Sequence, residues 1–152
     1  MGAVNILAII LGLLFVWAGT VKVVPINPFD HGYDVMSEEF VRYATVSPLK
    51  AIGLDLSPDL YRTIVGVIEI MAGCLLAFGR YHYRLLSAVD IICIMNGAMY
   101  TLYALGDSLV NILPAFVFEI CAVLILVFRS GLKRGAGEPA PLPNQSKKNK
   151  RN

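Results

Sequence analysis

The sequence predicts an all-α membrane protein, a four-transmembrane-helix up-and-down bundle with an additional helix in the lumenal loop between spans one and two. Of the 152 residues, 57% are hydrophobic and only 16% are charged, and the mean hydropathy is +0.66. A water-soluble domain of this length exposes much of its surface and needs more charge than that. The charges are also clustered, which leaves apolar runs long enough to cross a bilayer.

Four apolar segments account for the predicted spans. A spanning helix needs roughly 20 predominantly apolar residues. The segments that meet this requirement are about 4–24, 60–78, 85–105 and 109–128. Short links join the last three, which makes successive helices antiparallel and favours an up-and-down bundle. We therefore expect one membrane domain, residues 1–130, followed by a tail, residues 131–152.

The first apolar segment has two interpretations. Its run "ILAIILGLLFVWAG" is also typical of a signal-peptide core, with Val16 and Ala18 as small residues before a cleavage site. No positive charge precedes this run, however, and the uncharged stretch from Met1 to Val21 is long enough to span the membrane. We expect a retained span and keep cleavage as the alternative.

The positions of lysine and arginine predict the orientation of the bundle. The loop 25–59 carries two basic and six acidic residues, whereas Arg80 and Arg84 lie in the next link and seven basic residues follow residue 128. Because basic segments stay on the cytosolic side, we expect both termini in the cytosol and the loop 25–59 in the lumen. The net charge of +2 is then a topology signal and does not predict nucleic-acid binding.

The tail is expected to be disordered, basic and cytosolic, because a segment rich in Pro, Gly, Lys and Asn cannot bury a core. It ends in "KNKRN", in which Lys148 and Lys150 form a Lys-x-Lys-x-x pattern. This pattern is similar to the dilysine retrieval signal of endoplasmic-reticulum membrane proteins, with a chance match as the alternative. Asn144 begins a glycosylation sequon that the predicted topology keeps out of the lumen.

The loop between spans one and two is too long to be a bare connector. Apolar residues recur with helical spacing opposite charged ones, which predicts an amphipathic helix at about 33–45. Ser47-Pro48 and Ser57-Pro58 have the pattern of helix caps with proline at the first helical position. We interpret the amphipathic helix as a lid on the lumenal rim of the bundle, or as a partner-binding surface.

One carboxylate, Glu69, lies in the middle of an apolar run in span two. Counting 1.5 Å per residue places it in the same half of the bundle as Lys22 of span one. Small residues beside a carboxylate let a neighbouring helix approach closely enough to satisfy it. We therefore expect spans one and two to pack along glycines and to bury a Lys22–Glu69 pair. The predicted faces contain Gly12, Gly19 and Lys22 on span one, and Gly66, Glu69 and Gly73 on span two.

Two further polar residues, Asn96 in span three and Glu119 in span four, fall near the membrane midplane, where they could form a hydrogen bond. Asp90, nearer the cytosolic edge, is expected to reach Arg84, Arg80 or water. Isolated charges at the bilayer centre are costly, so we expect them to face inward and to be paired or protonated. These intramembrane groups are interpreted as pins that set helix register. The alternatives are a polar cavity for a proton, quinone or small ligand, and a contact to another protein's spans.

The sequence contains no pattern typical of a catalytic, cofactor-binding or metal-binding site, and we expect a non-enzyme without a cofactor. His31 and His82 fall in predicted loops on opposite sides of the membrane, and no Ser/His/Asp set, HExxH or phosphate loop occurs. The cysteines lie in apolar runs without a CxxC, so neither a disulfide nor a zinc site is predicted. The residues expected to be inert hydrophobes facing lipid or a helix are Cys74, Cys93 and Cys121.

Three segments resemble the transmembrane protein 35 family, and they occur in the same order and at the same spacing as in that family. They are "FVWAGTVKVVP" (15–25), "SPLKAIGLDLSPDLYRTIVGVIEIMAGCLLAFG" (47–79) and "GAMYTLYALGDS" (97–108). The family is a branch of the DoxX-like superfamily, and the chain is most similar to its shorter, NACHO-like B-type branch over about residues 11–129. The motif residues that match are Gly19, Lys22, Gly66, Glu69 and Gly73.

The resemblance implies a bundle in the endoplasmic-reticulum membrane that acts as a chaperone in assembly of nicotinic acetylcholine receptors. A-type members have a longer acidic tail, so the short basic tail here leaves the client open. Other DoxX-like proteins are linked to quinone or thiol redox chemistry, and the lack of a CxxC argues against a thiol version. We expect a chaperone or assembly factor for multi-span clients such as nicotinic-type channel subunits. The alternatives are a redox or quinone-linked membrane enzyme subunit that uses a Lys22–Glu69 pocket, and an accessory subunit of a stable membrane complex.

Overall fold

The computed structural model describes residues 2–25 and 30–135, and their side chains as far as residue 128. Throughout these residues the fold is all-helical, with no strand. Four helices are long and apolar enough to cross a membrane, which confirms the predicted fold class. In chain order the helices are α1 (Ala3–Val23), α2 (Asp30–Val46), α3 (Pro48–Ala51), α4 (Pro58–Phe78), α5 (Tyr81–Ala104) and α6 (Leu109–Gly135).

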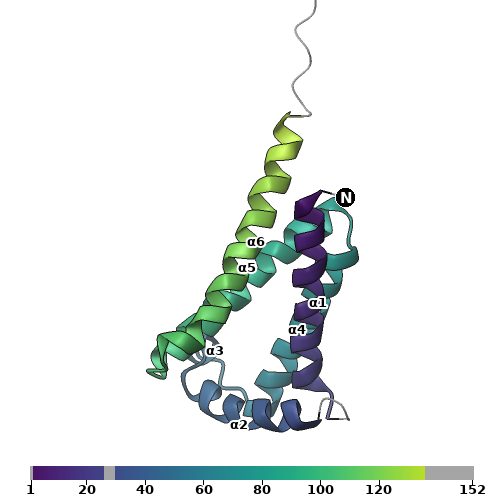
Figure 1. Cartoon of the computed structure of the whole chain (residues 1–152). Helices are drawn as coiled ribbons and strands as arrows, with labels where there is room; N and C mark the ends of the chain where they lie inside the picture. The colour runs from purple at the N-terminus through teal and green to yellow at the C-terminus, as the bar shows by residue number, and fades with distance from the viewer. Residues whose placement is uncertain (1, 26–29, 136–152) are drawn as a thin grey trace, which may run out of the picture.

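The long helices form two closely packed pairs, α1 with α4 and α5 with α6. Contacts of α1 with α6 and of α4 with α5 join the pairs into one bundle. Figure 1 shows the pairs close together at the end that holds the N-terminus and spread apart at the end that holds α2. We call these the N-terminal end and the α2 end. Helix α6 leaves the bundle on the side where α1 begins (Figure 1).

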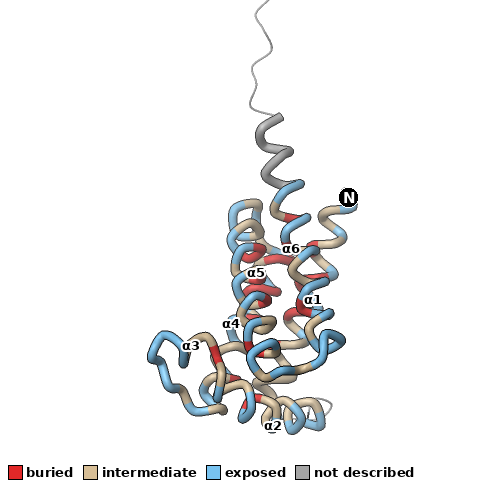
Figure 2. Tube along the Cα trace, turned by 90° about the vertical axis from the view of Figure 1, so that its left-hand side faces the viewer, coloured by how far each residue is buried: buried red, intermediate tan, exposed pale blue. Residues whose placement is uncertain are grey.

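The hydrophobic core fills the space between the pairs towards the N-terminal end. Many of its members are alanines, which allow helices to approach closely. The hydroxyl of Ser87 on α5 adds a buried hydrogen bond to the carbonyl oxygen of Ala72 on α4. Figure 2 shows buried positions on the inward faces and exposed positions on the outward ones. The core residues are Ala8, Leu11, Phe15, Ala72, Leu76, Ala88, Ile91, Met95, Ala115, Ala122 and Ile125.

The first span is an integral part of this core. Helix α1 contributes five buried residues, and it packs along α4. Its outward face carries large apolar side chains that are about half exposed, such as Ile10 and Trp17. Side chains of this kind suit a lipid surface. This segment therefore makes one of the closest helix contacts of the bundle.

The predicted helix caps are present, and the predicted amphipathic helix forms with a different start. The predicted helix at 33–45 is α2, which starts three residues earlier. The hydroxyl oxygen of Ser47 accepts from the backbone N–H of Lys50, and that of Ser57 accepts from Leu60, with proline at the first position of α3 and α4. Helix α4 therefore starts at Pro58, before the apolar run. The backbone of α6 stays helical to Gly135, and the predictions for Asn144, Lys148 and Lys150 lie outside the described residues.

Candidate functional site

Helices α1 and α4 touch through their backbones at glycine. A Cβ added at Gly12 would lie 2.6 Å from the carbonyl oxygen of Gly73, and one added at Gly73 would lie 2.5 Å from that of Gly12. Two helical turns further along α1, a Cβ at Gly19 would overlap the carbonyl oxygen of Gly66. No larger residue fits at these positions unless the helix backbones move apart. The glycines therefore set the distance between α1 and α4.

The same helix faces bring Lys22 and Glu69 together, the two side chains that the sequence analysis paired. Nζ of Lys22 lies 2.6 Å from Oε2 of Glu69 and donates a second hydrogen bond to the carbonyl oxygen of Ala18 at 3.3 Å. The two side chains are 13% and 6% exposed. If either side chain were removed, the other would remain as an uncompensated buried charge, which is strongly destabilising. Each side chain is therefore needed by the other.

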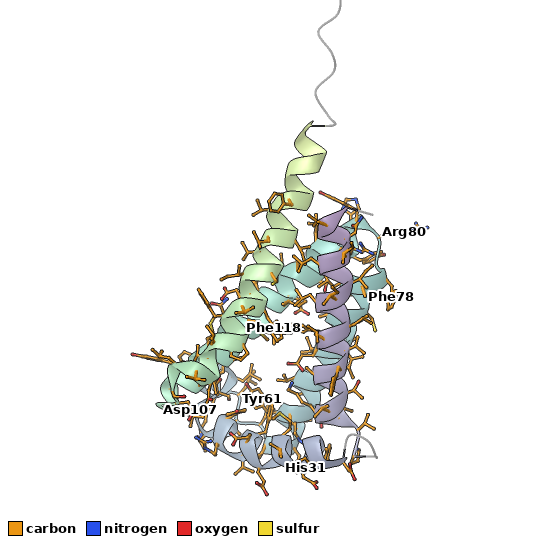
Figure 3. The ribbon with its side chains drawn as sticks, viewed as in Figure 1. His31, Tyr61, Phe78, Arg80, Asp107 and Phe118 are labelled. Atoms are coloured by element: carbon orange, nitrogen blue, oxygen red, sulfur yellow. The ribbon has the colours of Figure 1, made fainter. Side chains whose placement is uncertain are left out.

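A cavity of about 430 Å³ lies between the two helix pairs, on the side of the core that faces α2. Cavities of this size are typical of small-molecule sites. Its wall is mainly apolar, and Figure 3 shows Tyr61 and Phe118 between the two pairs. Lys22 and Glu69 lie on this wall, and Pro114, which is inside α6, lies across from them. The cavity is the candidate ligand site of the bundle.

Helix α2 covers the cavity and is fastened to the α1–α4 pair by Arg62. This side chain is only 3% exposed, and it donates to the carbonyl oxygen of Lys22 at 3.2 Å and to Oδ1 of Asp59 at 3.0 Å. It also donates to the hydroxyl of Tyr33 on α2 at 2.7 Å, with its guanidinium carbon 3.9 Å from the centre of that ring. The sequence analysis missed Arg62. The sequence feature that could have pointed to it is its position, since Arg62 is a charged residue in the first turn of a predicted span.

The other side of α2 is fastened to the turn between α5 and α6. Arg42 donates to Oδ1 of Asp107 at 3.1 Å and to Oε2 of Glu39 at 3.0 Å. The hydrogen bond to Asp107 and the charge of Glu39 raise the pKa of Arg42 above its usual value. Burial, together with the charge of Glu39, raises the pKa of Tyr43 to about 12, so the phenol that faces the cavity stays neutral. Helix α2 therefore bridges the two helix pairs.

Asn96 and Glu119 also meet, as expected, but they face outward. Nδ2 of Asn96 donates to Oε1 of Glu119 at 2.7 Å and to the carbonyl oxygen of Ile92 at 2.8 Å. Asn96 is exposed and Glu119 is partly exposed. The core-facing side of α5 is filled by apolar residues such as Ile91 and Met95, so Asn96 lies on the outer side of that helix. In a membrane this pair would face lipid or another protein.

In the described part of the chain, neither arginine considered for Asp90 pairs with it, which leaves water as the remaining expected partner. Arg84 donates to Oδ1 of Asn5 at 3.3 Å and to the carbonyl oxygen of Ala77 at 2.7 Å, and it forms no ion pair with Asp90. No arginine among the described side chains pairs with Asp90. The two histidines lie in the first turns of α2 and α5 instead of in loops. The described side chains contain no group of three His, Cys, Asp or Glu residues that could hold a metal ion.

Comparison with known proteins shows a resemblance to a receptor chaperone. No family model matches the chain. The chain is similar to a protein of Macaca fascicularis named "Novel acetylcholine receptor chaperone", with 25% identity over 141 residues. The alignment covers 92% of this chain and 83% of the other, so it includes most of every long helix.

Proposed function

We propose that the protein is a non-enzymatic chaperone or assembly factor of the endoplasmic-reticulum membrane, of the NACHO-like B-type branch of the DoxX-like superfamily. Its clients would be unassembled multi-span proteins such as nicotinic-type channel subunits. The similarity to a receptor chaperone over 92% of the chain carries the proposal. Four spanning-length helices support a multi-pass location. The distribution of Lys and Arg supports cytosolic termini and a lumenal α2.

The outward face of α5 and α6 supports client binding. After their mutual hydrogen bond, Oδ1 of Asn96 and Oε2 of Glu119 accept no hydrogen bond from any side chain or backbone group in the described part of the chain. Lipid tails cannot supply donors, whereas a client helix with a hydroxyl or amide at the same depth can. An unassembled subunit still exposes polar groups that its neighbours later cover. The pair is therefore suited to recognise a client span before assembly.

Affinity purification tests the proposal. The full-length protein, purified in mild detergent from cells that co-express nicotinic receptor subunits, should recover unassembled subunits and not the mature receptor. A complex of fixed stoichiometry with mature proteins would indicate an accessory subunit instead, and a stoichiometric bound quinone would indicate the enzyme-subunit alternative.

Two substitutions test the outward face. The double variant Asn96→Leu, Glu119→Leu should lower client recovery roughly fivefold or more, because interhelical hydrogen bonds contribute about 1–2 kcal/mol in membranes. Phe116→Leu on the same face, which removes no polar group, is the matched control. Equal recovery by all three proteins would exclude this face as the client site.

The proposed location has separate tests. Lys148→Ser with Lys150→Ser should shift the protein from the endoplasmic reticulum towards the cell surface if the C-terminal pattern is a retrieval signal. Unchanged location would contradict that role. Carbohydrate on Asn144 would contradict the proposed orientation, because the tail would then have entered the lumen.

A further inference from the structure

The cavity beneath α2 combines an apolar wall with one polar spot. Phe15 of α1, Ile68 of α4, Met95 and Ala98 of α5, and Phe118 of α6 contribute to the wall. The polar spot is the Lys22–Glu69 pair, which lies on the same wall. A ligand that fits must therefore be largely hydrocarbon with a single small polar group.

The hydrogen bonds of the pair define that polar group. A lysine ammonium has three donors, and Lys22 uses two of them, on Glu69 and on the carbonyl oxygen of Ala18. Glu69 accepts through Oε2 only, and its Oε1 receives no hydrogen bond from any described residue. The pair consequently has one N–H donor of Lys22 and one oxygen atom of Glu69, Oε1, that remain without a partner among the described residues and can bind a ligand in the cavity.

A single hydroxyl group of a ligand satisfies both remaining positions. It accepts from Lys22 and donates to Glu69 at the same time. A ketone or quinone carbonyl only accepts, so it would leave Oε1 of Glu69 without a partner in an apolar surrounding. An amine head group would place a second cation beside Lys22. A hydrocarbon alone would form neither of the two remaining hydrogen bonds.

We propose that this cavity binds a hydroxyl-headed membrane amphiphile, whose hydroxyl bridges Nζ of Lys22 and Oε1 of Glu69 while its hydrocarbon body contacts the apolar wall. Sterols and acylglycerols share this chemistry. The site faces the interior of the bundle, away from Asn96 and Glu119, and its existence does not depend on the proposed chaperone function.

Photolabelling of the full-length protein tests the proposal. The probes are a photoreactive, alkyne-bearing cholesterol and a photoreactive, alkyne-bearing diacylglycerol, each compared with its methyl ether, which cannot donate. At least one hydroxyl probe should label peptides of α4 or α5 that line the cavity, and its ether should label them about tenfold less. The probe that labels identifies the lipid class. Equal labelling by the hydroxyl probes and their ethers, or labelling confined to peptides outside the cavity, would overturn the proposal.

Two substitutions on one helix provide the matched comparison. Ala98→Phe fills the cavity without removing the polar pair, and it should lower labelling by the hydroxyl probe about tenfold. Val89→Phe, at a position of α5 that is 44% exposed, should leave labelling unchanged. Thermal unfolding in detergent checks that both variants fold. A folded Ala98→Phe protein that is labelled like the unsubstituted chain would contradict binding in this cavity.

Discussion

The α1–α4 and α5–α6 pairs use an intramembrane carboxylate in opposite ways. Glu69 has Gly66 and Gly73 at i−3 and i+4, and the backbones close around its contact with Lys22. Glu119 has bulky neighbours at the same two spacings, Phe116 and Val123, which are 49% and 39% exposed. The residues that flank a carboxylate thus decide whether it is enclosed between helices or presented on the outer surface.

Replacing each carboxylate in turn should reveal the largest difference in stability between the two helix pairs. Glu69→Leu leaves Lys22 as an uncompensated buried charge and should lower the free energy of unfolding by about 3–5 kcal/mol. Glu119→Leu on the outer surface loses one hydrogen bond between α5 and α6 and should lower the free energy of unfolding by only about 1 kcal/mol. Unfolding in a denaturing detergent measures both. Adding Lys22→Met to Glu69→Leu should restore most of the loss, and equal destabilisation by the two single variants would contradict the comparison.

Glycine substitution should give the next largest difference. Gly73→Ala places a Cβ against the backbone of α1 and should lower the free energy of unfolding by about 1–3 kcal/mol. Gly97→Ala on α5 is the control, because its Cβ would meet only Cγ of Pro48 at an ordinary 3.6 Å. Since alanine favours helix over glycine, this variant should be neutral or slightly more stable. Thermal unfolding of both proteins in the same detergent makes the comparison.

The Arg62 anchor of α2 should have a smaller and more local effect. Arg62→Met removes the hydrogen bonds to Tyr33, Asp59 and the carbonyl oxygen of Lys22. We expect a loss of about 2 kcal/mol and faster amide hydrogen exchange in α2, because hydrogen bonds to a buried charge are among the stronger ones. Thr63→Val in the same turn is the control. Unchanged exchange in α2 would show that this anchor does not hold the helix.

The opposite anchor should have the smallest effect. Arg42→Gln removes an exposed ion pair with Asp107, so global stability should stay the same within the precision of a thermal melt. Hydrogen exchange at the C-terminal half of α2 should rise slightly at low salt and less at high salt, because salt already screens the pair. A clear drop in the melting temperature would mean that the α5–α6 side holds α2 as firmly as the α1–α4 side does.

The sequence predicts the parts of this molecule that depend on local pattern and depth. Helix positions and the serine caps follow from residues within one turn, and the partners of Glu69 and Glu119 follow from the fixed rise of a helix. The outward direction of Asn96 could not be predicted, because it depends on which helix faces the neighbours occupy. Arg62 was missed because its contacts with Tyr33 and Lys22 join positions 29 and 40 residues apart along the chain.

The bridging helix α2 also acts as a spacer. Its 17 residues give a rigid rod of about 25 Å, and its two anchors hold it across the open end of the bundle. The distance between the two helix pairs at the α2 end is then fixed by the number of turns in α2. Inserting a turn into α2 would widen the α2 end of the bundle, and deleting one would narrow it, while the four long helices stay intact.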